Sequence, residues 1–241
     1  MNKIIKRIID WLATTNSLLF VWKIFGKGIK YIVNKLNGSI VFYNDAEKSK
    51  VLNLIKEIQA ENKMLLENNE AYQLFMAVKR TQTVEGDIAE VGSYMGGSAK
   101  LICEAKGNKE LYLFDTFEGL PNLSRWDDPA QFQKGNFSSS FNYVENYLKH
   151  YPNVYLYKGL FPATSKPIEN KRFSFVHLDV DLYEATRASI EFFYPRMMKG
   201  AVMISHDYDT PGVSKAFDEF FRDKPEPIIE MSGCQCLIVK V

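Results

Sequence analysis

From residue 84 onward, short apolar runs alternate with longer amphipathic segments, and this alternation constrains the fold more than any other feature of the chain. The apolar runs predict strands at 87–91, 110–114, 154–157, 173–178, 201–205, 227–231 and 236–239, and the segments between them predict helices at 97–105, 139–149, 184–197 and 212–221. Strands that alternate with helices favour a mostly parallel, doubly wound α/β sheet, because right-handed crossovers place helices on both faces. The last two strands have no helix between them and should pair as an antiparallel hairpin at one edge.

The first 43 residues differ in charge from the rest of the chain. They carry seven Lys or Arg and one Asp, although the whole chain of 241 residues has a formal net charge of only +1. The near-neutral total gives no case for a nucleic-acid footprint. Residues 11–22 form a charge-free aromatic stretch, shorter than the roughly 20 apolar residues of a membrane-spanning helix. Two interpretations of this basic, amphipathic arm stay open: a helix that packs on the domain or on a second subunit of a homodimer, and a helix that lies on an anionic membrane surface.

Residues 44–83 carry apolar side chains at helical spacing among Lys and Glu, which predicts helices ahead of the α/β domain. The sequence therefore divides into a basic arm at 1–43, a helical cap at 44–83 and the α/β domain at 84–241. The cap and the long loop at 116–137 are the candidate lids over a binding site. Three cysteines are too few for a disulfide framework, and Cys234 and Cys236 lack the spacing of zinc ligands. A reducing, cytoplasmic setting is the simplest interpretation, at the inner face of the membrane if the arm binds lipid.

A glycine-rich turn follows the first predicted strand, in the stretch Ile88-Ala-Glu-Val-Gly-Ser-Tyr-Met-Gly-Gly-Ser98. Its glycines let the backbone approach a ligand, and the helix that follows presents free N–H groups. The spacing G-x-x-x-G-G differs from the G-x-G-x-x-G of dinucleotide binders, and Glu90 suits a cationic amine better than a pyrophosphate. Asp115 ends the second predicted strand, where an acid can accept both hydroxyl hydrogens of a ribose. Each feature alone fits a tight turn or a loop cap, but together they favour a cofactor with an amine, a carboxylate and a ribose.

Acidic side chains also follow two later strands. Asp179 and Asp181 come after the predicted strand at 173–178, and His206 and Asp207 come after the next one. The two strands should be neighbours, so their carboxyl ends could place the four side chains around one point. Carboxylates that converge without a cation raise each other's pKa values, and a divalent ion removes the conflict. Oxygen ligands with one imidazole suit Mg²⁺ or Mn²⁺. One aspartate here could simply cap the next helix, but the whole group exceeds what capping needs.

Five stretches occur in order within residues 85–240. They are Ala89-Glu-Val-Gly-Ser-Tyr-Met-Gly-Gly-Ser98, Phe114-Asp-Thr-Phe-Glu-Gly-Leu-Pro121, Lys158-Gly-Leu-Phe-Pro162, His177-Leu-Asp-Val-Asp-Leu-Tyr183 and His206-Asp-Tyr208. Together they resemble the macrocin O-methyltransferase (TylF/MycF) family of class I S-adenosylmethionine-dependent methyltransferases. The resemblance implies a seven-stranded, Rossmann-like domain that methylates hydroxyl groups, often on sugars of natural products, with the help of a divalent metal.

The resemblance also assigns roles to residues of this chain. The cofactor-binding residues that it implies are Glu90, Gly92, Tyr94, Gly96, Ser98, Asp115 and Gly159. The metal ligands that it implies are Asp179, His206 and Asp207, and Asp181 is the implied general base. The family usually has Asp-Asp-Tyr where this chain has His206-Asp-Tyr, so His206 is either a metal ligand or the base.

The acceptor implied by the resemblance is a hydroxyl of a small molecule or glycan, on a surface polysaccharide or on a natural-product sugar. Two other classes of protein stay open. One is a nucleotide- or NAD-dependent oxidoreductase on a similar sheet, and the G-x-x-x-G-G spacing argues against it. The other is a non-catalytic, membrane-associated binding protein that uses the basic arm, and the acids at four strand ends argue against that class.

Overall fold

The computed structural model describes residues 46–61 and 64–241 of the chain. The predicted arm at residues 1–43 lies outside this part, so the membrane and subunit contacts expected of it stay predictions. From Ser49 to Val241 the chain forms one compact unit. None of the helices in the described part is long and apolar enough to cross a bilayer.

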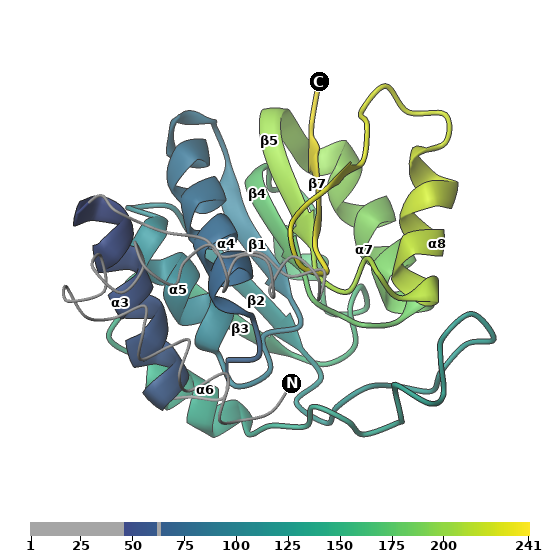
Figure 1. Ribbon diagram of the computed structural model, residues 1–241, viewed down its shortest axis with the longest axis horizontal. Coiled ribbons are helices and arrows are strands. Elements are labelled where there is room, and N and C mark those ends of the chain that lie inside the picture. The colour runs from purple at the N-terminus through teal and green to yellow at the C-terminus, as the bar shows by residue number, and fades with distance from the viewer. Residues whose placement is uncertain (1–45, 62–63) are drawn as a thin grey trace, which may run out of the picture. The chain divides into compact units, whose positions relative to one another are not determined.

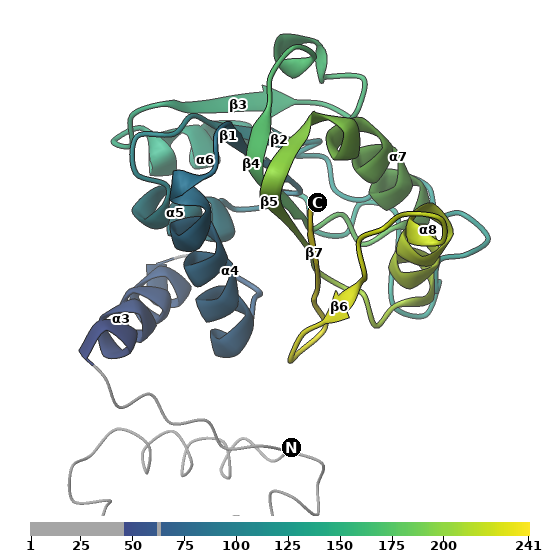
Figure 2. The same cartoon turned by 90° about the horizontal axis from the view of Figure 1, so that it is seen from above.

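Seven strands of the described residues form a sheet in the order β3-β2-β1-β4-β5-β7-β6 (Figure 1, with β6 labelled in Figure 2). The strands are β1 Asp87–Val91, β2 Leu111–Asp115, β3 Val154–Lys158, β4 Phe173–Leu178, β5 Met197–Ser205, β6 Ile229–Glu230 and β7 Cys236–Val239. Neighbours among β1 to β5 run parallel, whereas β7 runs antiparallel to both β5 and β6. The strand order reverses between β1 and β4. The structure thus confirms the predicted mostly parallel sheet with a C-terminal hairpin.

Helices cover both faces of this sheet. The α-helices of the described part are α3 Ala46–Glu61, α4 Asn68–Arg80, α5 Gly97–Ala105, α6 Phe141–Leu148, α7 Tyr183–Phe193 and α8 Pro211–Phe221. Helices α3 to α6 lie on one side of the sheet, and α7 and α8 lie on the other (Figure 1, Figure 2). Leu111 and Leu113 of β2 pack in the core under α3 to α6, whereas Tyr112 and Phe114 pack in the core under α7 and α8. Because side chains alternate along a strand, one short apolar run supplies both cores.

Some element boundaries differ from the predicted ones. The helical pattern predicted a helix over 184–197, but α7 ends at Phe193 and a 3₁₀ turn follows at Tyr194–Arg196. That turn contains a proline, which has no N–H to donate inside an α-helix. Strand β5 begins earlier than predicted, at Met197, and β6 keeps only Ile229–Glu230. The carboxyl ends of the parallel strands, where the predicted site residues lie, agree with the prediction to within one residue.

Candidate active site

The register of the sheet aligns the ends of β1, β4 and β5, where predicted site residues lie. Val91 of β1 pairs with Leu178 of β4, and Leu178 pairs with Ser205 of β5. The ladder then continues past the strand ends, because Asp179 N–H donates to Val91 O at 2.9 Å and His206 N–H donates to Leu178 O at 2.9 Å. Backbone pairing, rather than a flexible loop, therefore positions the first residue after each strand.

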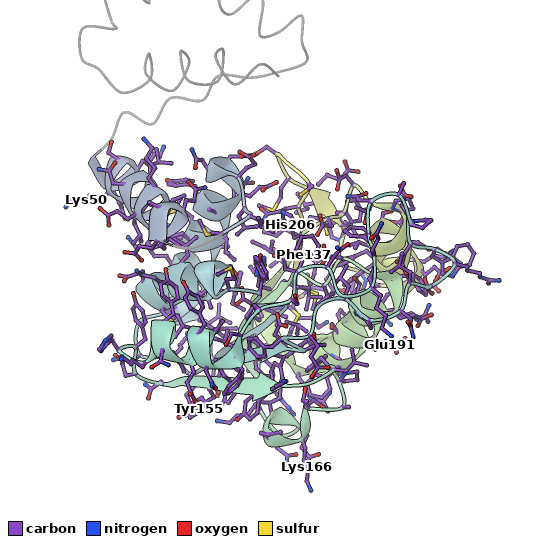
Figure 3. The ribbon with its side chains drawn as sticks, turned by 90° about the horizontal axis from the view of Figure 1, so that it is seen from below. Lys50, Phe137, Tyr155, Lys166, Glu191 and His206 are labelled. Carbon is purple, nitrogen blue, oxygen red and sulfur yellow. The ribbon has the colours of Figure 1, made fainter. Side chains whose placement is uncertain are left out.

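A cavity of about 260 Å³ opens at these strand ends. Most of the predicted site residues line it, namely Gly92, Tyr94, Ser98, Asp115, Gly159, Asp179, Asp181, His206 and Asp207. Residues 64–66, ahead of α4, and Phe132 and Phe137 of the long loop complete its wall. In the view of Figure 3, His206 and Phe137 are labelled close together, whereas Tyr155 and Lys166 are labelled far from them. The structure thus brings the two predicted groups of residues to one cavity.

Gly92 brings the glycine turn into contact with the end of β4. Its φ is +90°, and a Cβ at this position would lie 1.8 Å from the carbonyl oxygen of Asp179. No side chain fits at that distance, so only glycine lets the chain leave β1 beside β4. Gly96 does not line the cavity; its left-handed φ of 84° places it at the N-cap of α5. The glycine-rich segment therefore places Ser98, at the start of α5, in the cavity wall.

Backbone N–H groups hold Asp115 at the end of β2. Its Oδ2 accepts a hydrogen bond from Tyr94 N–H at 2.7 Å, and its Oδ1 accepts one from Phe117 N–H at 2.6 Å. Burial raises the pKa of the Asp115 carboxyl, and these N–H groups offset only part of the effect. The Ser93 backbone also hydrogen-bonds this carboxylate. Because a carboxylate has about four acceptor positions, it can still accept a ligand hydroxyl. Gly159, which also lines the cavity, donates its N–H to Asp115 O at 2.9 Å.

Glu90 lies outside the cavity wall, unlike the other acids of the predicted site. Its carboxylate is fully buried, and Oε1 lies 2.9 Å from Nδ1 of His177, which is also fully buried. The two residues are register partners in β1 and β4, so the sheet itself sets the pair. Glu90 therefore ties β1 to β4, and its predicted contact with a cofactor amine stays a prediction.

His206 lies at the centre of the acidic half of the cavity. Its Nδ1 lies 2.9 Å from Asp207 Oδ2 and 3.3 Å from Asp179 Oδ1. Its Nε2 lies 3.1 Å from Cys234 Sγ and 3.5 Å from Glu70 Oε2. Asp179, His206 and Asp207 offer ligand atoms that all lie within 4.8 Å of one another. Two carboxylates and one imidazole at this spacing form a donor set that Mg²⁺ or Mn²⁺ can use.

The acids of this half change one another's ionisation. Burial raises the pKa of Asp181 well above its usual range, and the carboxylates of Asp179 and Asp207 raise it further. Burial also opposes ionisation of Asp179, but the charge and hydrogen bond of His206 outweigh it and lower the pKa of Asp179. Burial works against protonation of His206, yet the surrounding carboxylates raise its pKa. Asp181 and Asp207 have left-handed φ values of 61° and 57°, a form of backbone strain that clusters at functional sites.

Glu70 and Cys234 contact His206, and the sequence analysis identified neither as a site residue. Glu70 lies in the first turn of α4, Cys234 lies between β6 and β7, and Glu70 Oε1 accepts the Cys234 N–H at 3.0 Å. Burial opposes ionisation of Glu70, but hydrogen bonds from His206, Cys234 and Glu67 lower its pKa to about 2. Glu70 and Cys234 are far apart in the sequence, so no local spacing predicts that α4 meets the C-terminal hairpin. The one hint in the sequence was Cys234, a cysteine that fits neither a disulfide framework nor a zinc-ligand spacing.

Comparison with known proteins shows that the chain is similar to O-methyltransferases. The family profile described as Macrocin-O-methyltransferase (TylF) matches residues 68–234. The 8-demethyl-8-(2,3-dimethoxy-alpha-L-rhamnosyl)-tetracenomycin-C 4'-O-methyltransferase of Streptomyces olivaceus is 26% identical over 175 residues, which cover 62% of this chain and 64% of that protein. The mycinamicin III 3''-O-methyltransferase of Micromonospora griseorubida is 26% identical over 158 residues, which cover 58% of this chain and 62% of that protein. The chain therefore spans less than two thirds of the length of these relatives.

Solved structures share the fold. The O-methyltransferase NovP superposes with a TM-score of 0.65 at 21% identity, over 74% of this chain and 82% of that chain. The family profile covers more than half of the chain, from α4 to the turn before β7. The chain belongs to the TylF macrocin-O-methyltransferase family.

Proposed function

We propose that this protein transfers a methyl group from S-adenosylmethionine to a hydroxyl group of a sugar on a small molecule. The observation that carries the proposal is the single cavity in which a glycine turn and Asp115 meet Asp179 and Asp181. Membership of the TylF family supports O-methyl transfer. The name of the Streptomyces relative includes a rhamnosyl group and a 4' position. This supports a sugar attached to a small molecule, rather than a surface polysaccharide, as the acceptor.

The half of the cavity beside β1 and β2 suits the methyl donor, which carries its methyl group on a positively charged sulfur. The free lone pairs of Asp115 suit the two ribose hydroxyls, as an acid at the end of the second strand does in related sheets. Phe114, Leu160 and Phe161 line the cavity with Gly159 and offer apolar surface for an adenine ring. We assign the methionine part to the turn from Gly92 to Ser98.

The half beside β4 and β5 suits a divalent cation. Its carboxylates lie close enough that like charges raise the pKa of Asp181, and a bound cation would relieve that repulsion. Asp179 and Asp207 would hold the ion. His206 Nδ1 either joins them as a third ligand or donates a hydrogen bond that orients both carboxylates. When bound there, such an ion would neutralise the acids and lower the pKa of a neighbouring hydroxyl.

Asp181 is the proposed general base. It lines the cavity two residues after Asp179, and a carboxylate with a raised pKa accepts a proton more strongly once it is ionised. The acceptor oxygen attacks the methyl carbon in line with the carbon–sulfur bond, and the hydroxyl proton passes to Asp181. Phe132 and Phe137 of the long loop, together with residues 64–66, would exclude water and align the two substrates.

A methyl-transfer assay tests this function. Methyl-labelled S-adenosylmethionine would be incubated with rhamnosylated polyketides, nucleotide sugars and polysaccharide fragments, each with Mg²⁺ or with EDTA. We expect label on the rhamnosylated class, with one S-adenosylhomocysteine released per methyl transferred. A calorimetric titration that shows NAD binding and no S-adenosylmethionine binding would instead support the oxidoreductase alternative.

The setting of the protein is a further part of the proposal, and it rests on sequence alone. Seven Lys or Arg within residues 1–43 support contact with an anionic membrane, and the aromatic stretch at 11–22 supports a second subunit equally well. Cosedimentation with anionic vesicles, compared with a variant in which Lys3, Lys6 and Arg7 become Glu, tests the membrane contact. Sedimentation equilibrium of the same two proteins, in a reducing buffer at neutral pH, measures the mass in solution and so tests for a homodimer.

A further inference from the structure

Three potential metal ligands from separate elements meet on the side of His206 that faces away from Asp179 and Asp207. They are Glu70 of α4, His206 after β5 and Cys234 between β6 and β7. The distances between their donor atoms are 3.5 Å for Nε2 to Glu70 Oε2, 3.1 Å for Nε2 to Cys234 Sγ and 3.3 Å for Sγ to Glu70 Oε1. A carboxylate, an imidazole and a thiol thus form a compact triangle.

These spacings agree with the geometry of a tetrahedral ion. Zinc binds sulfur at roughly 2.3 Å and nitrogen or oxygen at roughly 2.0–2.2 Å, so two of its ligands lie roughly 3.3–3.6 Å apart. The 3.1 Å between Nε2 and Sγ, and the 3.3 and 3.5 Å from Sγ and Nε2 to the two oxygens of Glu70, are close to that range. One ligand atom of each residue lies within 4.8 Å of the other two. The site needs little rearrangement to accept an ion of this size, and three protein ligands leave the fourth position for water.

The surrounding chain is built to hold this triangle. Gly233 has a φ of +96°, and a Cβ there would lie 2.3 Å from Glu70 Oε1, so a larger residue would displace the Glu70 carboxylate from its present position. Two side chains of α4 tie the helix to the same turn, since Asn69 Nδ2 donates to Ser232 O at 3.1 Å and Gln73 Nε2 donates to it at 3.2 Å. Helix α4 and the hairpin turn are therefore fixed together before any ion arrives.

The ring of His206 is already oriented for coordination through Nε2. Its Nδ1 lies 2.9 Å from Asp207 Oδ2, where a neutral ring with its proton on Nδ1 would donate a hydrogen bond. The lone pair then resides on Nε2, toward Glu70 and Cys234. Histidines that bind metals usually donate their other N–H to a carboxylate, and Asp207 Oδ2 lies within hydrogen-bond distance of Nδ1 to accept it.

We propose that Glu70, His206 and Cys234 form a second metal site that binds a thiophilic divalent cation of the Zn²⁺ class. The carboxylate and the thiolate balance the two charges of the ion, and sulfur with nitrogen selects zinc over magnesium. A neutral imidazole has one lone pair, so His206 cannot also bind the ion held by Asp179 and Asp207. The inference rests on the proposed function in one respect only. It assigns His206 to donate a hydrogen bond that orients Asp179 and Asp207, the carboxylates proposed to hold the first ion.

Cobalt titration of the full chain tests the proposal, because Co²⁺ occupies zinc sites and shows a thiolate charge-transfer band in the near ultraviolet. We expect one Co²⁺ per chain to produce this band, stoichiometric Zn²⁺ to abolish it and a large excess of Mg²⁺ to leave it unchanged. Cys234→Ser should remove the band and weaken Zn²⁺ binding by at least about 100-fold. The matched control Cys236→Ala, two residues along the same hairpin, should change Zn²⁺ affinity by less than about threefold.

A chemical measurement covers the case in which Cys234→Ser does not fold. In the wild-type protein, Zn²⁺ should protect Cys234 from alkylation, as mapped by mass spectrometry, and Mg²⁺ should not. Absence of the thiolate band with wild-type protein, or a Cys234 that alkylates equally fast with and without Zn²⁺, would show an ion pair only and overturn the proposal. Methyl transfer measured on the same samples keeps the two proposals separate, since either can fail while the other holds.

Discussion

The two halves of the cavity are built in different ways. At the ends of β1 and β2, the backbone completes the site, since Asp115 accepts two backbone N–H groups and Gly92 lies against another strand end. At the ends of β4 and β5, side chains contact one another, and His206 lies within 3.5 Å of three carboxylates and a thiol. In the first half, backbone contacts hold the binding residues in place without any ion. In the second half, carboxylates surround His206 and would be balanced by a bound cation.

This difference means that the two halves should fail separately. Changes beside β1 and β2 should weaken binding of the methyl donor, and changes beside β4 and β5 should slow its transfer. Gly92 belongs to both halves, because it contacts the backbone of Asp179. Each of the following predictions tests this separation.

Removal of divalent ions should strongly reduce turnover, and it should act on the acidic half alone. We expect dialysis against EDTA to lower kcat by at least about 100-fold and Mg²⁺ to restore it, because the carboxylates lose the cation that balances them. Donor affinity, measured by calorimetry in the same buffers, should change by less than about threefold. Full turnover in excess EDTA would contradict the metal-assisted mechanism.

Substitution of Gly92 should damage both halves at once. Gly92→Ala places a Cβ 1.8 Å from the Asp179 carbonyl, and we expect a loss of about 3 kcal/mol or more in the free energy of unfolding. The matched control is Gly135→Ala, where φ is +84°, close to the +90° of Gly92, but a Cβ would meet nothing within 4 Å. That variant should lose only about 1 kcal/mol. Equal losses in urea unfolding would show that the contact with β4 does not constrain the turn.

Substitution of one carboxylate in each half by an amide should affect donor affinity in one variant and kcat in the other. Asp115→Asn should weaken S-adenosylmethionine binding by about 10- to 100-fold, equal to about 1.4–2.8 kcal/mol, because one ribose acceptor becomes a donor. Asp181→Asn should leave that affinity within about threefold and instead lower kcat by at least about 100-fold. Calorimetry and single-turnover rates on both variants check the pattern, and loss of affinity in Asp181→Asn would disprove the separation.

The smallest predicted effect is a pH dependence of donor binding. Because burial raises the pKa of Asp115, protonation begins at a higher pH than for an ordinary aspartate. The protonated carboxyl has fewer acceptor sites for the ribose, so affinity should fall a few-fold as the pH is lowered from neutrality toward that raised pKa. Asp115→Asn should remove this dependence, and an unchanged pH profile in that variant would assign it to another group.

The sequence predicted the strand ends well because the apolar runs of β2, β4 and β5 end beside polar residues for which we propose a chemical role. Asp115, Asp179 and His206 lie where backbone pairing alone places them. Contacts between distant segments could not be read in this way. Glu70 meets Cys234 across 164 residues of chain, and both reach His206 only because α4 and the hairpin pack together. The sequence also contained no sign that Glu90, predicted to bind the cofactor, pairs with His177 across the sheet, and its contact with a cofactor stays a prediction.

The measurement that tests the central claim most directly is donor binding and turnover in Asp179→Ala. The substitution removes the carboxylate but keeps the backbone carbonyl that contacts Gly92. We predict that the dissociation constant for S-adenosylmethionine stays within about threefold of wild type, while turnover falls by at least about 1,000-fold, or about 4 kcal/mol. Retained turnover, or loss of donor binding in a variant that still unfolds like wild type, would contradict a site made of two separable halves.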